Sequence, residues 1–276
     1  MKLRRREFLK TSLAASATAA LGSNLHAASK SSAAGREYYE LRCYRLKPGG
    51  SPAPLNSYLE KALLPALDKR GIKNVGVFTE LEVEKKAGTS KPMANSPVWV
   101  LIPHTTLDSF ATTAAELNQD PAVQKAGGEY LRIPKSSPAF ERVDTWLYRA
   151  FKGMPKMEIP AFSKSKTSGR VFEMRDYESH SELAALSKMT MFDEGETEIM
   201  RDLGMSPMLF GQSLAGPNLP HLRYFTGGPS LEAHLANWKK FGPDPRWQKM
   251  SKMEKYKDTT SKNTARFVVP TAYSTI

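Results

Sequence analysis

Two matching sets of polar side chains are the first place in this sequence where chemistry could be carried out. The first set is Glu40, Arg42 and Tyr44, and the second is Glu173, Arg175 and Tyr177. Arginine can hold an anionic group, and Tyr or Glu can move a proton. Because side chains alternate along a strand, each set shares one face. The sets therefore predict a polar pocket, unless each Glu and Arg form a pair with a purely structural role, as buried charges require.

The histidines add one residue to this candidate pocket and predict no metal site. Five are present, and their spacing forms neither an HxH nor an HExxH pattern. His221 lies just before an expected strand, where it could line the mouth of a cavity. His180 and His234 are the residues that could ligate haem, but we predict no cofactor. No phosphate-binding loop, nucleophile elbow or triad motif is recognisable in the sequence.

Both polar sets belong to an internal repeat. Residues 39–44 (YELRCY) return 133 positions later as 172–177 (FEMRDY), and residues 120–125 (DPAVQK) return 124 positions later as 244–249 (DPRWQK). The change in offset indicates that one internal loop is about nine residues longer in the first copy. We assign the extra length to the charged residues 82–92, which are expected to form a loop.

Each copy has the pattern of a strand, a helix, two strands, a second helix and a last strand. Strands are expected at 38–46, 75–80, 98–102 and 143–151, and again at 171–177, 208–213, 222–225 and 267–273. Helices are expected at 55–67 and 107–117, and again at 183–203 and 231–241. Pro65 predicts a kink in the first helix.

This order predicts an α+β fold made of two tandem ferredoxin-like (β-α-β-β-α-β) domains. Helices cover one face of each sheet, so the two bare faces are expected to pack sheet to sheet as an intramolecular dimeric α/β-barrel. If the apolar alternate residues face the helices, the two polar sets project into this barrel. The expected domains are residues 37–151 and 170–276, joined by a linker over 152–169.

The N-terminus carries the three blocks of an export signal. Arg4-Arg5-Arg6-Glu7-Phe8-Leu9-Lys10 resembles the twin-arginine motif, an apolar small-residue run follows over 11–21, and small residues end it near 28. The apolar run is too short and too weakly hydrophobic for a comfortable membrane span. We expect residues 1–28 to be a twin-arginine signal peptide that directs the protein to the periplasm or cell envelope; a basic terminus that is never cleaved is the alternative.

Composition narrows the classes of function. The single cysteine, Cys43, excludes an internal disulfide and a multi-cysteine metal site. The formal net charge is +12, and removing the leader, with five basic residues and one acid, leaves +8. This charge is dispersed and no nucleic-acid-binding motif accompanies it, so we predict no nucleic-acid partner. A solvated basic face, or one that meets an anionic envelope surface, is the expectation.

The residues at 39–49 (YELRCYRLKPG) and 244–248 (DPRWQ) resemble the NIPSNAP family of the dimeric α/β-barrel superfamily. The resemblance extends over nearly the whole mature chain as two copies. It departs from the family at Val123, where the second copy has Trp247, and at the variable motif position, which holds Cys43 in one copy and Asp176 in the other. These differences predict that the copies have specialised and that only one of two pockets keeps a site.

What the resemblance implies about activity is broad. The family includes interaction proteins and exported bacterial members, and the wider superfamily includes cofactor-free monooxygenases, haem enzymes and isomerases. We expect an exported barrel protein that binds a small molecule or another protein in the cell envelope. The alternative is a cofactor-free oxygenase or isomerase acting on a small aromatic or anionic substrate, and whether the protein is an enzyme is left undecided. No membrane span is expected after signal removal, and a homo-oligomer is compatible with the sequence.

Overall fold

The computed structural model describes residues 35–276, so the export signal expected at 1–28 lies outside the described residues. The strands of the first half are β1 (Tyr38–Arg45), β2 (Gly76–Glu84), β3 (Thr89–Pro92), β4 (Val98–His104) and β5 (Arg142–Ala150). Those of the second half are β6 (Val171–Glu178), β7 (Leu209–Ala215), β8 (His221–Gly228) and β9 (Lys262–Pro270).

The helices fall between the strands in the predicted order. The first half has α1 (Ala53–Tyr58), the π-helical turn η1 (Leu59–Leu63), α2 (Leu64–Lys69), α3 (Leu107–Gln119), α4 (Pro121–Ala126) and α5 (Gly128–Leu131). The short helix α6 (Ala161–Lys164) lies between the halves. The second half has α7 (Glu182–Met191), the π-helical turn η2 (Phe192–Glu196), α8 (Thr197–Asp202), α9 (Leu231–Phe241), α10 (Pro245–Met250) and the 3-10 turn η3 (Glu254–Tyr256). None of these helices, all within residues 35–276, is both long enough and apolar enough to cross a membrane.

The strands of both halves form one closed antiparallel barrel. Their order is β3-β2-β4-β1-β5-β7-β8-β6-β9, and β9 pairs back onto β2. Within each half the order is that of a ferredoxin-like sheet. The halves are joined at two seams, β5 with β7 and β2 with β9, which use the same pair of edge strands from each half. The prediction of an α+β intramolecular barrel is confirmed. The two sheets also form hydrogen bonds along their edge strands, in addition to packing face to face.

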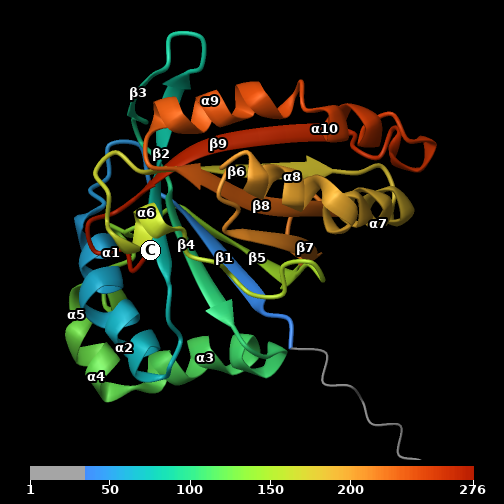
Figure 1. Ribbon diagram of the computed structural model, residues 1–276. Coiled ribbons are helices and arrows are strands. Elements are labelled where there is room, and N and C mark those ends of the chain that lie inside the picture. The colour runs from blue at the N-terminus through green and yellow to red at the C-terminus, as the bar shows by residue number, and fades with distance from the viewer. Residues whose placement is uncertain (1–34) are drawn as a thin grey trace, which may run out of the picture. The chain divides into compact units, whose positions relative to one another are not determined.

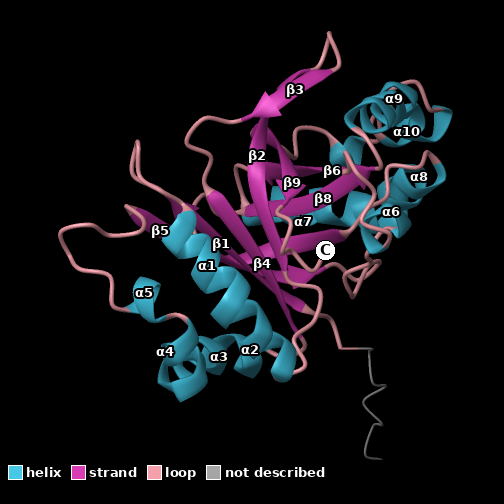
Figure 2. Ribbon diagram, turned by 90° about the vertical axis from the view of Figure 1, so that its left-hand side faces the viewer, coloured by secondary structure: helices cyan, strands magenta, loops and turns pink. Residues whose placement is uncertain are grey.

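Three hydrophobic clusters divide the molecule into layers. One lies inside the barrel and draws on both halves, with Tyr39, Trp99, Phe172 and Phe225 among its members. The other two lie between the barrel and the helices of one half each. Figures 1 and 2 show the helices α1 to α5 on one side of the strands and α7 to α10 on the other.

One end of the barrel interior is closed by segments that are not strands. Met157, Ile159 and Phe162, from the segment between β5 and β6, pack against the interior cluster. The side chain of Ile276 is fully buried in the same cluster. The segment expected to be a linker therefore contributes to the core, and Met154 from the same segment is buried in the cluster of the second half.

The two halves share an unusual helical feature at the same place. The π-helical turns η1 and η2 begin at Leu59 and Phe192, which are 133 residues apart, the offset of the repeat. A π-helical turn is rare inside an α-helix and frequently lies at a functional site. Pro65 lies just after η1, so the predicted irregularity of this helix takes the form of a π-helical turn followed by α2.

The expectation of a loop over 82–92 is wrong. β2 continues to Glu84 and pairs with β3, so these residues form a hairpin that projects beyond the rest of the barrel (Figure 2). The hairpin reaches the other half, where the Nζ of Lys85 lies 3.4 Å from the Glu173 carboxylate. Charged residues masked the strand pattern because both faces of this hairpin are largely exposed.

Candidate ligand site at the mouth of the barrel

The orientation predicted for the two polar sets is wrong. Tyr39, Leu41 and Cys43, the apolar alternates of β1, belong to the interior cluster, whereas Tyr44 packs among the helices of the first half. The polar sets thus lie between the sheet and the helices, because the two sheet faces bury each other and take the apolar residues. The six residues are Glu40, Arg42, Tyr44, Glu173, Arg175 and Tyr177, and they form two separate groups rather than one pocket.

In the first half, the buried carboxylate of Glu40 has two partners. The Nε of Arg42 lies 2.6 Å from its Oε1, and the Nε2 of His104 lies 3.3 Å from its Oε2. Burial by itself raises the pKa of Glu40, but the hydrogen bond from His104 and the charge of Arg42 outweigh it and hold this pKa below its usual range. Tyr44 packs edge-on against Phe140. Glu40 and Arg42 therefore satisfy each other, as the structural alternative required.

In the second half, Glu173 is fully buried and has three cationic or imidazole partners. The Nε2 of His234 is 2.9 Å from its Oε2, and Arg175 and Lys85 lie 3.6 Å and 3.4 Å from its Oε1. The Arg175 guanidinium also lies 4.5 Å from the ring centroid of Trp238. These contacts hold the helix α9 and the β2–β3 hairpin on the sheet, and Tyr177 joins the same layer through a 2.8 Å hydrogen bond to Tyr224.

His221 lies at a different place from both groups. Its Nδ1 is 3.0 Å from the Asn218 carbonyl oxygen and its Nε2 is 3.1 Å from the Tyr148 hydroxyl. The carbonyl can only accept, so Nδ1 carries the proton and Nε2 accepts from Tyr148. Burial, followed by the charge of Arg223, lowers the pKa of His221. The residue lines an apolar cavity of about 430 Å³ together with Met189 and Leu219.

The two histidines named as candidate haem ligands, His180 and His234, lie in different surroundings. His180 is exposed and His234 is bound to Glu173, so neither is a free imidazole facing a cavity. Over residues 35–276, no group of three or more His, Cys, Asp or Glu side chains is arranged to hold a metal ion.

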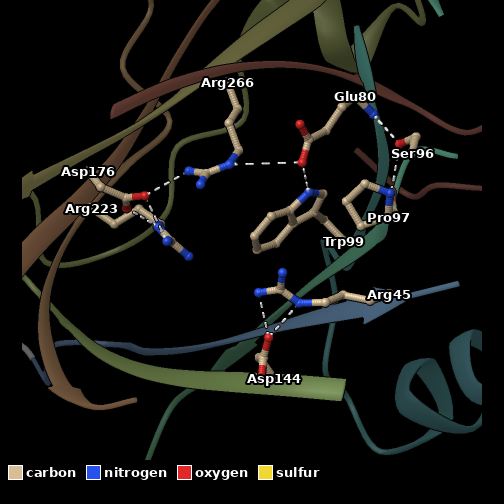
Figure 3. Close-up of polar contacts among 9 residues, drawn as sticks. All are labelled: Arg45, Glu80, Ser96, Pro97, Trp99, Asp144, Asp176, Arg223 and Arg266. Atoms are coloured by element: carbon tan, nitrogen blue, oxygen red, sulfur yellow. Dashed lines mark hydrogen bonds and ion pairs between the residues drawn. The ribbon is translucent and has the colours of Figure 1, made fainter. Parts of the chain in front are cut away.

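A polar cavity of about 430 Å³ lies at the end of the barrel opposite the packed segments. Side chains from both halves line it, and three arginines reach into it from three different strands (Figure 3). The charged and aromatic lining residues are Arg45, Glu80, Trp99, Trp146, Asp176, Glu178, Arg223, Lys262 and Arg266. None of these was predicted as a site residue.

The centre of this cavity is the carboxylate of Asp176. Both of its oxygens bond Arg223, through Nε and through Nη2 at 2.9 Å, and Oδ2 is also 3.0 Å from Nη1 of Arg266. Burial raises the pKa of Asp176, but the two guanidiniums, Arg223 first, more than offset this and leave it below its usual range. The carboxylate is therefore ionised at neutral pH.

Arg223 is left with one unused donor. Its side chain is 5% exposed, and its Nη1 is buried without a hydrogen-bond partner. The guanidinium is held in place by Asp176 and by the ring of Trp146, whose centroid is 4.7 Å away. A buried donor without a partner costs on the order of 1 to 3 kcal/mol. Figure 3 shows the free end of this guanidinium directed into the space between Arg45 and Trp99.

The opposite wall of the cavity is fixed by Glu80 and Trp99. The indole Nε1 of Trp99 donates to Glu80 Oε1 at 2.8 Å, and Nε of Arg266 lies 3.9 Å from the same oxygen. At the rim, Arg45 pairs with Asp144 at 2.7 Å. Every carboxylate in this set is engaged, so the cavity holds its charges in fixed positions.

The register of the barrel shows how the two halves divide this cavity. Cys43 of β1 is opposite Trp99, and its counterpart Asp176 of β6 is opposite Arg223. In the same way, Leu41 is opposite Trp146 and its counterpart Met174 is opposite Arg266. The first half therefore supplies two tryptophans where the second supplies two arginines. The sequence contains these Trp-to-Arg differences between equivalent strands of the two copies. They point to the cavity only when the strand register is known.

The fold and the site together define a class: a single-chain α/β-barrel with a polar, arginine-lined cavity at one end of the strands. Residues 172–275 match the NIPSNAP family model, in agreement with the resemblance found in the sequence. No curated protein matches the chain by sequence.

Solved structures support the fold. A candidate monooxygenase from Lactobacillus acidophilus NCFM is similar over 85% of this chain and 94% of its own, with a TM-score of 0.53 and 7% sequence identity. An uncharacterised NIPSNAP-like domain protein from Burkholderia xenovorans covers 38% of this chain and 88% of its own, with a TM-score of 0.35 and 16% identity. At 7% identity, the likeness to the first of these structures shows the architecture alone and leaves the activity to be inferred from the site.

Proposed function

We propose that this protein binds a small, polar, oxygen-bearing molecule in the cavity at the mouth of the barrel. The observation that carries the proposal is the buried Nη1 of Arg223, which has no partner and belongs to a residue that lines a cavity of about 430 Å³. A carboxylate or carbonyl oxygen placed there would satisfy the donor without moving the guanidinium, which Asp176 already holds. Such preorganisation favours binding because little side-chain freedom is lost.

The charges of the cavity favour binding over proton transfer. The lowered pKa of Asp176 makes this carboxylate a weak base near neutral pH, and Glu80 is engaged by the indole N–H of Trp99. Cys43, at the same level of the barrel, is buried, and burial raises its pKa to about 12, which keeps the thiol protonated. These properties support a ligand-binding protein over the alternative of an oxygenase or isomerase at this site.

The N-terminal sequence supports a proposal about where in the cell the protein binds its ligand. Residues 4–10 (RRREFLK) carry the arginine pair of a twin-arginine signal, and we propose export to the periplasm or cell envelope. Changing Arg5 and Arg6 to Lys should retain the protein in the cytoplasm. Fractionation of cells that express the full chain tests this, and equal export of the double variant would contradict it.

The binding proposal is tested with purified mature protein and two simple acids. Malonate and benzoate are titrated while the melting temperature and the tryptophan fluorescence are followed, and native mass spectrometry reports any copurified molecule. Binding should raise the melting temperature and change the emission of Trp99 or Trp146, which line the cavity. Comparing the two acids tells whether the ligand is aromatic.

A variant pair makes the test specific. Arg223→Gln removes the free donor and should weaken binding at least tenfold, whereas Arg201→Gln removes an arginine whose partners Glu158 and Glu198 lie away from the cavity. Because Arg223→Gln also frees Asp176, its fold is checked by melting before titration. The proposal fails if wild-type protein carries no copurified molecule and neither acid alters the melting temperature, or if Arg201→Gln weakens binding as much as Arg223→Gln.

A further inference from the structure

A chain of three side chains in the first half lies outside the barrel-mouth site. The hydroxyl of Ser109 is 2.9 Å from Nδ1 of His104, and Nε2 of His104 is 3.3 Å from Oε2 of Glu40. The three come from different elements: β1 carries Glu40, the end of β4 carries His104 and the first turn of α3 carries Ser109. A hydroxyl, an imidazole and a carboxylate in this sequence of contacts have the arrangement of an activated nucleophile.

The protonation states follow from the partners. The pKa of Glu40 is held below its usual range, so the carboxylate is ionised and can only accept. His104 therefore carries its proton on Nε2, facing Glu40, and presents a bare Nδ1 to the hydroxyl of Ser109. Since the His104 side chain is fully buried, its ring is held in this orientation. The contacts thus place Nδ1 of His104 against the serine O–H.

A cavity gives access to this chain. Its volume is about 470 Å³, and both His104 and Ser109 line it, together with Arg70, Thr112 and Glu116. Ser109 is only partly buried, so its hydroxyl can be reached from this cavity. A cleft of a few hundred Å³ suits a small molecule.

The second half serves as an internal comparison. At the positions 124 residues later, it has Gly228 in place of His104 and Ala233 in place of Ser109, yet the strand and helix meet in the same way. There, the buried Glu173 is bound by His234 from the helix. The fold of this corner therefore needs neither the histidine at the end of the strand nor the serine.

We infer that Ser109, His104 and Glu40 form an esterase-type site for a small polar ester. Ser109 Oγ attacks the ester carbonyl carbon while its proton passes to His104 Nδ1. The tetrahedral adduct then breaks its bond to the alcohol oxygen, and His104 returns the proton to the departing alcohol. Water, deprotonated by His104, then attacks the acyl-serine; the bond to Ser109 Oγ breaks, His104 returns the proton to this oxygen, and the acid is released, so the enzyme is regenerated without any other reactant.

The experiment uses the mature protein with a fluorophosphonate probe and with p-nitrophenyl acetate. The probe should label Ser109, as located by peptide mass spectrometry, and the ester should be hydrolysed above the buffer rate. Ser109→Ala should abolish labelling and lower hydrolysis to the background, and His104→Gln should lower both at least 100-fold. Melting curves establish that each variant is folded.

A matched control comes from the other half. Ala233→Ser places a hydroxyl at the equivalent helix position, where the strand ends in Gly228 instead of a histidine, and it should add neither labelling nor hydrolysis. The inference is overturned if the wild-type protein is not labelled at Ser109, or if hydrolysis survives in Ser109→Ala. It does not depend on the barrel-mouth site, because Arg223→Gln leaves this chain of contacts untouched and should be labelled normally.

Discussion

The two halves of this protein have the same fold but fill the layer between sheet and helices differently. In the first half, Leu55 and Leu63 lie in this layer and are buried. In the second, the positions 133 residues later are Lys188 and Glu196, which are also buried and pair at 2.8 Å. The Lys188 ammonium lies 4.7 Å from the ring centroid of Phe192 as well. The fold therefore requires side chains of suitable volume here, and charge is tolerated only as a pair.

The largest expected effect comes from breaking this pair. Lys188→Met leaves the Glu196 carboxylate buried without a partner, in a place where burial already raises the pKa of Glu196. We expect a loss of about 3 to 5 kcal/mol in the free energy of unfolding, measured by urea denaturation. The double change Lys188→Leu and Glu196→Leu copies the first half and should restore wild-type stability or exceed it. If Lys188→Met alone were as stable as wild type, the Glu196 carboxylate would not be a buried charge that depends on Lys188.

A second test exchanges counterparts inside the barrel. Asp176→Cys places in the second half the residue that the first half has at Cys43, and it removes the carboxylate shared by Arg223 and Arg266. The unfolding free energy should fall by about 2 to 3 kcal/mol, less than for the buried pair because Arg266 is partly exposed.

The control for this exchange is at the same mouth. Glu178→Gln breaks the contact with Lys262, whose side chain is 62% exposed, and should cost less than about 1 kcal/mol. Equal losses in the two variants would mean that Asp176 has no special role.

The third test uses pH. The pKa of His221 is lowered in the folded protein, so below its ordinary value of 6.5 the unfolded chain binds the proton more readily. Its contribution is fully present above pH 6.5 and is lost as the pH falls through this region. His221→Gln should flatten the dependence of unfolding free energy on pH between 7 and 5, by at most about 1.4 kcal/mol per pH unit, since one proton is involved. His180→Gln, at an exposed site, should leave this slope unchanged. If both variants flattened the slope, the effect would arise in the unfolded chain and not from the burial of His221.

The smallest effect concerns the thiol that stands where the second half has Asp176. Cys43 is 2% exposed, and burial raises its pKa to about 12. Native protein at pH 8 should react with a thiol reagent such as dithiobis(nitrobenzoate) at least 100-fold more slowly than protein in urea. Fast labelling of native protein would show that the barrel mouth opens to the level of Cys43.

The repeat made the fold predictable, because two copies of a strand and helix pattern constrain each other. The direction in which each face of a strand points was harder to predict. The strand β1 is buried on both faces, so the alternation of Leu41 and Arg42 separates two sets of residues without telling which set faces the helices. The apolar pattern of the helix expected at 183–203 was also misleading. It includes Leu183 and Leu186, whose side chains are 76% and 56% exposed.

The barrel-mouth site could not be found from local motifs. Arg223 and Arg266 are 43 residues apart and meet only because β8 and β9 both pair with β6. A single sequence contains this information only as a comparison between copies, in which Trp99 corresponds to Arg223. The contact of Ser109 with His104 is closer in the chain, yet its third member, Glu40, comes from β1.

The packed segment between β5 and β6 has a genetic consequence. In a barrel assembled from two identical subunits, one codon sets both symmetry-related positions, so an arginine gained on one side of the mouth is gained on the other. Here residues 151–170 join the halves in one chain, and each position has a codon of its own. Trp99 could therefore be kept while its counterpart became Arg223, a combination that no symmetric dimer of a single gene product can encode.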